Sequence, residues 1–272
     1  MLEDLKPHIQ DLRKRLIISI LVLLGAFGVC LGFWEQIFYY IKLPLVDVLG
    51  SEIRGKFIAS GMIEGVFIAM KSALFAALII AMPVIFWQIW IFVAPGLYKH
   101  EKKIVIPFVF FGTFMFALGV AFSYFGVLPF IIKNVLLFGN DQFEAYITAE
   151  NYFAFFIRLI IGFGIAFELP VLCFFLGKVG LITDESLKGF FKYAVVIIFI
   201  IAAIIAPPDV ISQVLLAIPL VMLYGISIVI LKFVNPASKL ADFDTDDDES
   251  DEAQPTTYTT PTTQDSKDFN KE

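Results

Sequence analysis

Charged residues are scarce in this chain. Asp, Glu, Lys and Arg together make up 17% of its 272 residues, whereas a soluble domain carries about 25%. Histidine and cysteine are scarcer still, with two residues of each. Two histidines are too few for a metal site. Cys30 and Cys173 both fall inside apolar runs, where packing thiols are a better interpretation than a disulfide.

Several patterns that indicate chemistry are also missing. The residues show no nucleophile–base set, glycine-rich phosphate loop or metal-ligand spacing, so we do not expect an enzyme, a cofactor or a metal. No basic patch of the kind that binds nucleic acid is present. The net charge of -6 comes from the tail, where eight of the eleven residues from Asp242 to Glu252 are acidic. No small-x-small cleavage site clearly follows the first apolar run, so we expect this run to stay as an anchor.

Long apolar runs dominate what is present. Hydrophobic residues make up 59% of the chain, and 31 residues are Phe. Runs of about 18 or more apolar residues predict membrane-spanning helices. The sequence therefore predicts an all-α, polytopic membrane protein. We place its six transmembrane helices at residues 16–33, 66–93, 104–128, 152–176, 193–206 and 210–231.

The fifth of these spans is the shortest. Its apolar part has about 14 residues, or roughly 21 Å of helix, against a hydrocarbon core of about 30 Å. The span could begin earlier, near Leu187, or it could thin the bilayer or pack inside the bundle. The turn at residues 207–209 is so tight that spans five and six should form a hairpin. The partly apolar stretch 34–49 is expected to form short interfacial helices.

Lysine and arginine are divided unevenly between alternate loops. Four lie in one set of loops (Lys42, Arg54, Lys56 and Lys133) and twelve in the other. The twelve are Lys6, Arg13, Lys14, Arg15, Lys99, Lys102, Lys103, Lys178, Lys188, Lys192, Lys232 and Lys239. Because Lys and Arg concentrate on the cytoplasmic side, we expect both ends in the cytoplasm. Residues 1–235 then form the transmembrane domain, and residues 236–272 an acidic, disordered cytoplasmic tail.

Two acidic residues lie among these basic ones. Asp11 and Arg15 stand one turn apart if the first helix starts before the membrane, which is a favourable pair. By itself, this segment indicates a positive-inside anchor. Glu101 lies among three lysines. It is either a helix-start charge favoured by the macrodipole or a carboxylate held at the membrane surface for a cationic partner.

Glu168 is the most unusual residue inside a span. It lies roughly 12 Å from the cytoplasmic end of span four, where a charge costs on the order of 2.5–3.5 kcal/mol. Ionisable residues at such depth are candidates for function. Pro170 removes the helical donor of the Ala166 carbonyl, which predicts a kinked, polar concavity. The alternative is a protonated Glu168 that is hydrogen-bonded to a neighbouring helix.

Four other polar residues fall in or near the spans. Lys71 and Arg158 lie within about two turns of the outer ends, and snorkelling to the interface explains them. Asp209 is expected to be a helix N-cap. Gln213, one turn into span six, is expected to donate a hydrogen bond between helices.

Polar and proline-containing motifs recur along residues 1–235. They are His8…Asp-Leu-Arg-Lys-Arg15, Pro44, Pro83 with Gln88 and Trp90, Phe92-Val-Ala-Pro95-Gly-Leu-Tyr98-Lys-His-Glu101, Phe167-Glu-Leu-Pro170, Pro207-Pro208-Asp-Val-Ile-Ser-Gln213 and Leu215-Leu-Ala-Ile-Pro219. With these motifs in this order, the chain resembles TatC, the large membrane subunit of the twin-arginine protein translocase. The motif prolines are interpreted as structural.

The resemblance implies a function. TatC proteins recognise signal peptides with paired arginines and start the export of folded proteins across the cytoplasmic membrane. Export uses the proton-motive force, so no ATP site is expected. The resemblance assigns signal-peptide binding to Asp11 and Glu101, with Arg13, Phe92 and Tyr98 nearby. A carboxylate meets the planar fork of a guanidinium with two charge-assisted hydrogen bonds.

The resemblance also implies partners. These are the single-span proteins TatA and TatB, and further copies of the chain within a receptor complex. Glu168 would line a concave face open to lipid, where a partner helix or the apolar part of the signal could dock. Spans five and six, with Asp209 and Gln213, would form the usual docking surface.

Two positions depart from the family pattern. Asp11-Leu-Arg13 stands where the family usually has Glu-Leu-Arg, so the acid reaches one methylene less far. Ala206 stands where the family has Thr, which removes one hydroxyl at the outer turn. Two rival functions stay open on the residues alone. One is a small-molecule or ion transporter that uses Glu168, and the other is a passive assembly scaffold.

Overall fold

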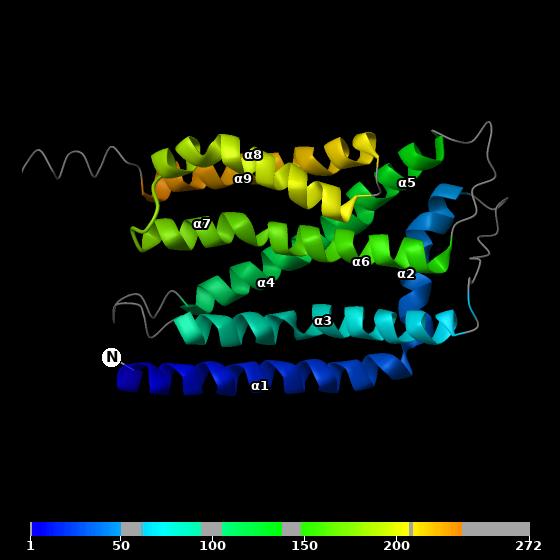
Figure 1. Ribbon diagram of the computed structural model, residues 1–272, viewed down its shortest axis with the longest axis horizontal. Helices are drawn as coiled ribbons and strands as arrows, with labels where there is room; N and C mark the ends of the chain where they lie inside the picture. Colours follow the sequence, from blue (N-terminus) through cyan, green and yellow to red (C-terminus); the bar gives the residue numbers. More distant parts are fainter. Residues whose placement is uncertain are drawn as a thin grey trace, which may run out of the picture.

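The structure, a computed structural model, describes residues 2–49, 61, 63–93, 105–137, 148–206 and 209–235. Its elements are helices (Figure 1). They are α1 (Leu2–Gly32), α2 (Trp34–Leu49), α3 (Glu64–Val93), α4 (Val105–Phe122), η3 (Ser123–Val127), α5 (Leu128–Leu137), α6 (Ala149–Ala166), α7 (Glu168–Lys178), α8 (Asp184–Ile205) and α9 (Val210–Val234). The predicted tail lies outside the described residues, as do Pro95, Tyr98, Glu101, Pro207 and Pro208.

Six helical stretches are long and apolar enough to cross a membrane, which confirms the predicted number of spans. They are Ile9–Gly32, Glu64–Phe92, Ile106–Val135, Ala149–Lys178, Asp184–Ile205 and Val210–Val234. Successive spans run in opposite directions, so α1 begins and α9 ends at the same end of the bundle (Figure 1). We call this the N-terminal end, and the opposite end, where α2 and α5 lie, the far end.

The fifth span is longer than its predicted apolar part. α8 has 22 residues, or roughly 33 Å of helix, whereas the predicted span begins at residue 193. The helix starts after Thr183, whose hydroxyl oxygen accepts a hydrogen bond of 3.3 Å from the Ser186 backbone N–H. Two lysines lie within its first nine residues, so the added length is polar. The helix is therefore long enough to cross a bilayer of ordinary thickness.

The third span is also longer than predicted and contains an irregular turn. α4 passes into the π-helix η3, and α5 continues to Leu137, beyond the predicted end at residue 128. A π-helix has a wider turn than an α-helix, and such turns are frequent at functional or strained places. Here the irregular turn carries Tyr124, which contacts α2.

α6 lies at the centre of the bundle and contacts α3, α4, α7, α8 and α9. Phe153, Phe156 and Phe163 are each at most 2% exposed. Where α4 crosses this helix, a Cβ on Gly119 would lie 2.7 Å from the Phe163 carbonyl oxygen, closer than real Cβ atoms come to other atoms. The approach of α4 to α6 therefore requires glycine at this position.

α2 lies across the far end of the bundle (Figure 1) and contains the buried Pro44. Because proline has no backbone N–H, the carbonyl of Tyr40, four residues earlier, loses its helical donor. The Tyr124 hydroxyl donates a hydrogen bond of 2.7 Å to this carbonyl. The Tyr152 hydroxyl, from α6, donates one of 2.7 Å to the next carbonyl, that of Ile41. Two tyrosines therefore fasten α2 to spans three and four beside its proline.

The Tyr152 contact leads to a stability prediction. Tyr152→Phe removes a buried hydrogen bond, and we expect it to lower the free energy of unfolding by about 1–3 kcal/mol. Thermal unfolding of the purified chain in detergent measures this change. Tyr39→Phe, on α2 itself, is the control, because Tyr39 is exposed and its hydroxyl makes no hydrogen bond with the described residues. Equal losses in the two variants would contradict the prediction.

Candidate functional site

The N-terminal end of the bundle presents a charged pair on α1. Arg15 Nη2 lies 3.9 Å from Asp11 Oδ2, one turn away, as predicted. The Asp11 side chain is 55% exposed. Exposed pairs contribute about 0–1 kcal/mol, so this contact leaves the Asp11 carboxylate available to another cation. Arg15 is more buried, and its Nε has no hydrogen-bond partner within the described part of the chain.

Two other predicted signal-peptide residues lie near this end. Arg13 is exposed on α1, and Phe92 is partly buried in the last turn of α3. α3 ends and α4 begins at the N-terminal end (Figure 1). The segment that joins them contains Tyr98 and Glu101, which lie outside the described residues. The helices on either side of these two residues therefore end near α1's charged start.

Span four is interrupted at Phe167. α6 ends at Ala166, and α7 begins at Glu168 with Pro170 in its first turn. Pro170 offers no N–H to the Ala166 carbonyl, which is why the regular hydrogen-bonding pattern stops here. The predicted interruption of this helix is therefore present, and Glu168 lies directly beside it.

Glu168 is 8% exposed and faces α4. A Cβ on Gly112 would lie 3.2 Å from Glu168 Oε2, so the missing side chain at Gly112 leaves space for the carboxyl group. Glu168 Oε1 has no hydrogen-bond partner among the described residues, and neither has the hydroxyl of Thr113, the next residue on α4. The predicted alternative, a hydrogen bond to a neighbouring helix, is absent from the described chain. Because buried polar atoms are normally paired, this carboxyl group is a candidate for function.

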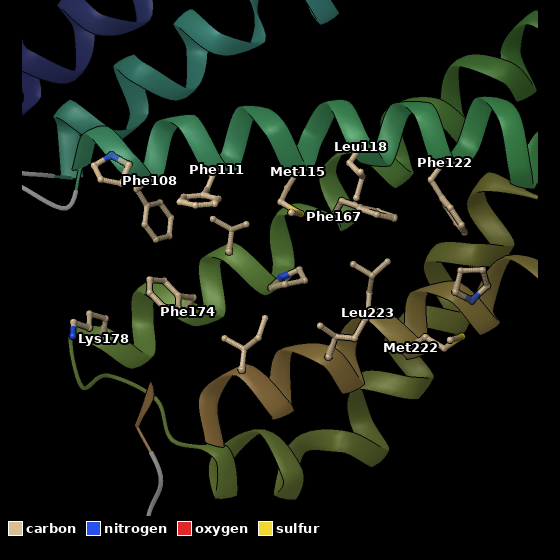
Figure 2. Close-up of a pocket in the computed structure, with 16 residues that line it drawn as sticks. Phe108, Phe111, Met115, Leu118, Phe122, Phe167, Phe174, Lys178, Met222 and Leu223 are labelled. Carbon is tan, nitrogen blue, oxygen red and sulfur yellow. The ribbon is translucent and has the colours of Figure 1, made fainter. Parts of the chain in front are cut away.

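A groove of about 820 Å³ lies between α4, α7 and α9 (Figure 2). Pro170 and Val171 line it, and Glu168 does not. Every lining residue except Lys178 is apolar, including Phe111, Phe122, Phe167, Phe174, Met222 and Leu223. The predicted polar concavity is therefore wrong in its polarity, because the carboxyl group of Glu168 faces Gly112 instead.

α8 and α9 pack together as the predicted hairpin. Asp209 Oδ2 accepts a hydrogen bond of 2.6 Å from the Ser212 backbone N–H, so the predicted N-cap is confirmed. Gln213 Nε2 donates to the Phe199 carbonyl of α8 at 3.0 Å, which confirms the predicted hydrogen bond between helices. Both side chains stabilise the hairpin, so any partner that docks here meets a surface already fixed by them.

The sequence did not reveal one polar contact at the far end. Lys71 Nζ lies 3.1 Å from Glu150 Oε1. The Glu150 backbone N–H also donates to Glu64 Oε1 at 3.1 Å. Lys71 and Glu150 are 79 residues apart in the sequence, so no local pattern connects them. Arg158 is exposed and forms no ion pair with the described residues.

Comparison with known proteins identifies the family. The family model for TatC, the Sec-independent protein translocase protein, matches residues 7–219. The chain belongs to the TatC family. TatC of Helicobacter pylori (strain J99) is 58% identical over 239 residues, which cover 88% of this chain and 93% of the relative. TatC of Campylobacter jejuni is 48% identical over 240 residues, which cover 88% and 98%.

The fold comparison agrees with the family. The crystal structure of the twin-arginine translocase receptor TatC matches with a TM-score of 0.76 and 41% identity, over 84% of this chain and 99% of that chain. The six-span bundle is therefore the TatC fold. TatC proteins are transport components and not enzymes. In the residues described, no group of three or more His, Cys, Asp or Glu residues could hold a metal ion.

The cap on α9 leads to a second stability prediction for this TatC family member. Asp209→Ala removes the acceptor for the Ser212 N–H, and we expect a loss of about 0.5–2 kcal/mol. Asp209→Ser is the control, because serine is also a good N-cap and keeps an oxygen at this position. Thermal unfolding in detergent compares the two. An equal loss in both variants would show that Asp209 acts through its charge and not as a cap.

Proposed function

We propose that this chain is the signal-peptide receptor subunit of the twin-arginine translocase in the cytoplasmic membrane. The observation that carries the proposal is the family match over residues 7–219, which includes both Asp11 and Glu101. The solved relative with the same fold is described as the translocase receptor. In this function the chain binds the signal peptide of a folded protein and starts its export.

The proposed binding surface lies at the N-terminal end of the bundle. Two arginines in a signal peptide require more than one acidic partner, and Asp11 and Glu101 supply two carboxylates. The exposure of Asp11 and its single long contact with Arg15 support this role. Phe92 and Tyr98 add aromatic rings, on which a guanidinium group stacks favourably. Arg13 is an exposed basic residue on α1, close in the sequence to Asp11.

The proposed orientation places this N-terminal end in the cytoplasm. Arg13, Lys14 and Arg15 lie in the N-terminal half of α1, Lys178 lies in the last turn of α7, and Lys232 in the last turn of α9. The start of α1 and the ends of α7 and α9 all lie at the N-terminal end of the bundle (Figure 1). Such a bias is typical of cytoplasmic membrane ends. Both ends of the transmembrane domain are then cytoplasmic.

The proposed partners are TatA and TatB, together with further copies of this chain in a receptor complex. The unpaired carboxyl group of Glu168 supports docking of a helix that carries a polar residue. The α8–α9 hairpin, held by Asp209 and Gln213, supports a second docking surface. Export in this proposal uses the proton-motive force.

The unpaired Glu168 also suits a second function, a transporter in which this carboxyl group binds a proton or a cation. That function requires no partner protein. Uptake of a small molecule or ion by vesicles that contain this chain alone would favour the transporter over the translocase.

Binding of a twin-arginine peptide to the purified full chain tests the proposed site. We expect Glu101→Ala to weaken binding by roughly 10- to 150-fold, the effect of losing a hydrogen bond between charged groups. We expect Asp11→Ala to weaken peptide binding less than Glu101→Ala does, and Asp11→Glu to bind the peptide like the unchanged chain. A peptide with its arginine pair changed to lysines should lose its specific binding to the unchanged chain.

The matched control for this site is Glu185→Ala. Glu185 is an exposed acid in the first turn of α8, at the same end of the bundle. It should bind the peptide like the unchanged chain. Unchanged binding in a folded Glu101→Ala variant would overturn the site assignment.

Glu168 is tested by export in cells. We expect Glu168→Ala to reduce export of a twin-arginine cargo at least tenfold, while peptide binding by the purified variant stays within twofold. Glu150→Ala, an exposed acid at the far end, is the control and should export normally. Full export by Glu168→Ala would favour the passive scaffold.

A further inference from the structure

The groove between α4, α7 and α9 has a direction. Lys178, the last residue of α7, lies at one end of it, the same end as Phe108 of α4 (Figure 2). Phe122, the last residue of α4, lies at the other end (Figure 2). Lys178 is the charged member of an otherwise apolar lining. The groove therefore has one polar end, at the N-terminal end of the bundle, and an apolar body that runs into the membrane.

The groove is at least as long as one leaflet is thick. In span four its lining runs from Phe167 to Lys178, roughly 16 Å, and on α4 from Pro107 to Phe122, roughly 22 Å. Half of a hydrocarbon core of about 30 Å is roughly 15 Å. A chain that starts at Lys178 and follows the groove therefore reaches about the middle of the bilayer.

The lining of the groove suits an acyl chain. The groove has a volume of about 820 Å³, and fifteen of its sixteen lining residues are apolar. The methionines Met115 and Met222, which line the groove, are flexible side chains that adapt to an irregular apolar occupant.

Charge favours an anionic headgroup at the polar end. Lys178 is exposed and forms no ion pair with any described residue. By contrast, Lys188 on α8 is already paired with Asp184 at 2.6 Å. A lysine ammonium at the depth of the headgroups attracts anionic lipid. A phospholipid with an acyl chain in the groove would have its headgroup phosphate beside this ammonium.

We propose that the groove binds an anionic phospholipid, with an acyl chain between α4, α7 and α9 and its phosphate on Lys178 Nζ. Only the identity of the leaflet, the cytoplasmic one, rests on the proposed function. A bound lipid would fill the concave surface next to the interruption of span four. It would also separate Glu168, which faces Gly112, from the bulk lipid on this side of α7.

Native mass spectrometry of the full chain tests the proposal. The chain is released from detergent after addition of phosphatidylglycerol or, separately, phosphatidylcholine. We expect the unchanged chain to retain phosphatidylglycerol about fivefold more tightly, and Lys178→Gln to remove this preference. Lys232→Gln is the control, because Lys232 is a basic residue in the last turn of α9 that does not line the groove. Equal effects of the two variants, or none for Lys178→Gln, would overturn the proposal.

A second pair of variants tests the groove itself. Ile226→Trp fills it, because Ile226 is half exposed and lines it, whereas Val229→Trp places the same ring on α9 outside the lining. We expect Ile226→Trp alone to reduce retention of both lipids at least tenfold. If this variant instead removes a dimer and leaves the lipid bound, the groove is an interface between two copies and the proposal fails.

The lipid proposal and the receptor proposal can be rejected independently of each other. Twin-arginine peptide binding is measured on the same Lys178→Gln preparation and should stay within twofold of the unchanged chain. Loss of peptide binding in the unchanged chain would remove the proposed receptor function and leave the lipid result standing. Retained peptide binding without any lipid preference would remove the lipid site alone.

Discussion

Inside a membrane, every backbone N–H and carbonyl must find its partner within the protein, because lipid offers none. Proline makes this constraint local by removing one donor. Beside Pro44, the hydroxyls of Tyr124 and Tyr152, from two other spans, donate hydrogen bonds to backbone carbonyls of α2. At Pro170 the helix is interrupted, and an acidic residue stands at the interruption. The same chemical deficit therefore fixes a helix at the far end and creates a candidate functional position in span four.

Close packing decides where that acidic side chain goes. Lipid chains are as apolar as leucine, so helices in a membrane associate through contacts at short range, often at small residues. Gly119 lets α4 approach α6, and Gly112, two turns earlier, leaves space for the carboxyl group of Glu168. Gly164 in turn receives the ring of Phe116 from α4. One glycine-rich helix contact thus both builds the core and shelters a carboxyl group from lipid.

Apolar length was sufficient to predict six spans, because it depends on composition over some twenty residues. The Asp11–Arg15 pair, the Asp209 cap and the interruption at Pro170 were also predictable, since each depends on neighbours within four positions. The Lys71–Glu150 pair and the hydrogen bonds from Tyr124 and Tyr152 to α2 were not predictable, because their partners are 79 to 111 residues away. The apolar groove was missed for a related reason. The side chain of Glu168 faces Gly112 of α4 and not the groove, and Gly112 is 56 residues away in the sequence.

α1 has few neighbours. Its main contact is α3, with a smaller one to α2. Only 6% of the most apolar 18-residue stretch of this span is buried inside the protein. During synthesis these partners are complete once residue 93 has been made, before spans three to six exist. The first two spans therefore form a unit that can pair in the membrane ahead of the rest. The exposed acid Asp11 belongs to this early unit, whereas Glu168 belongs to the part assembled afterwards.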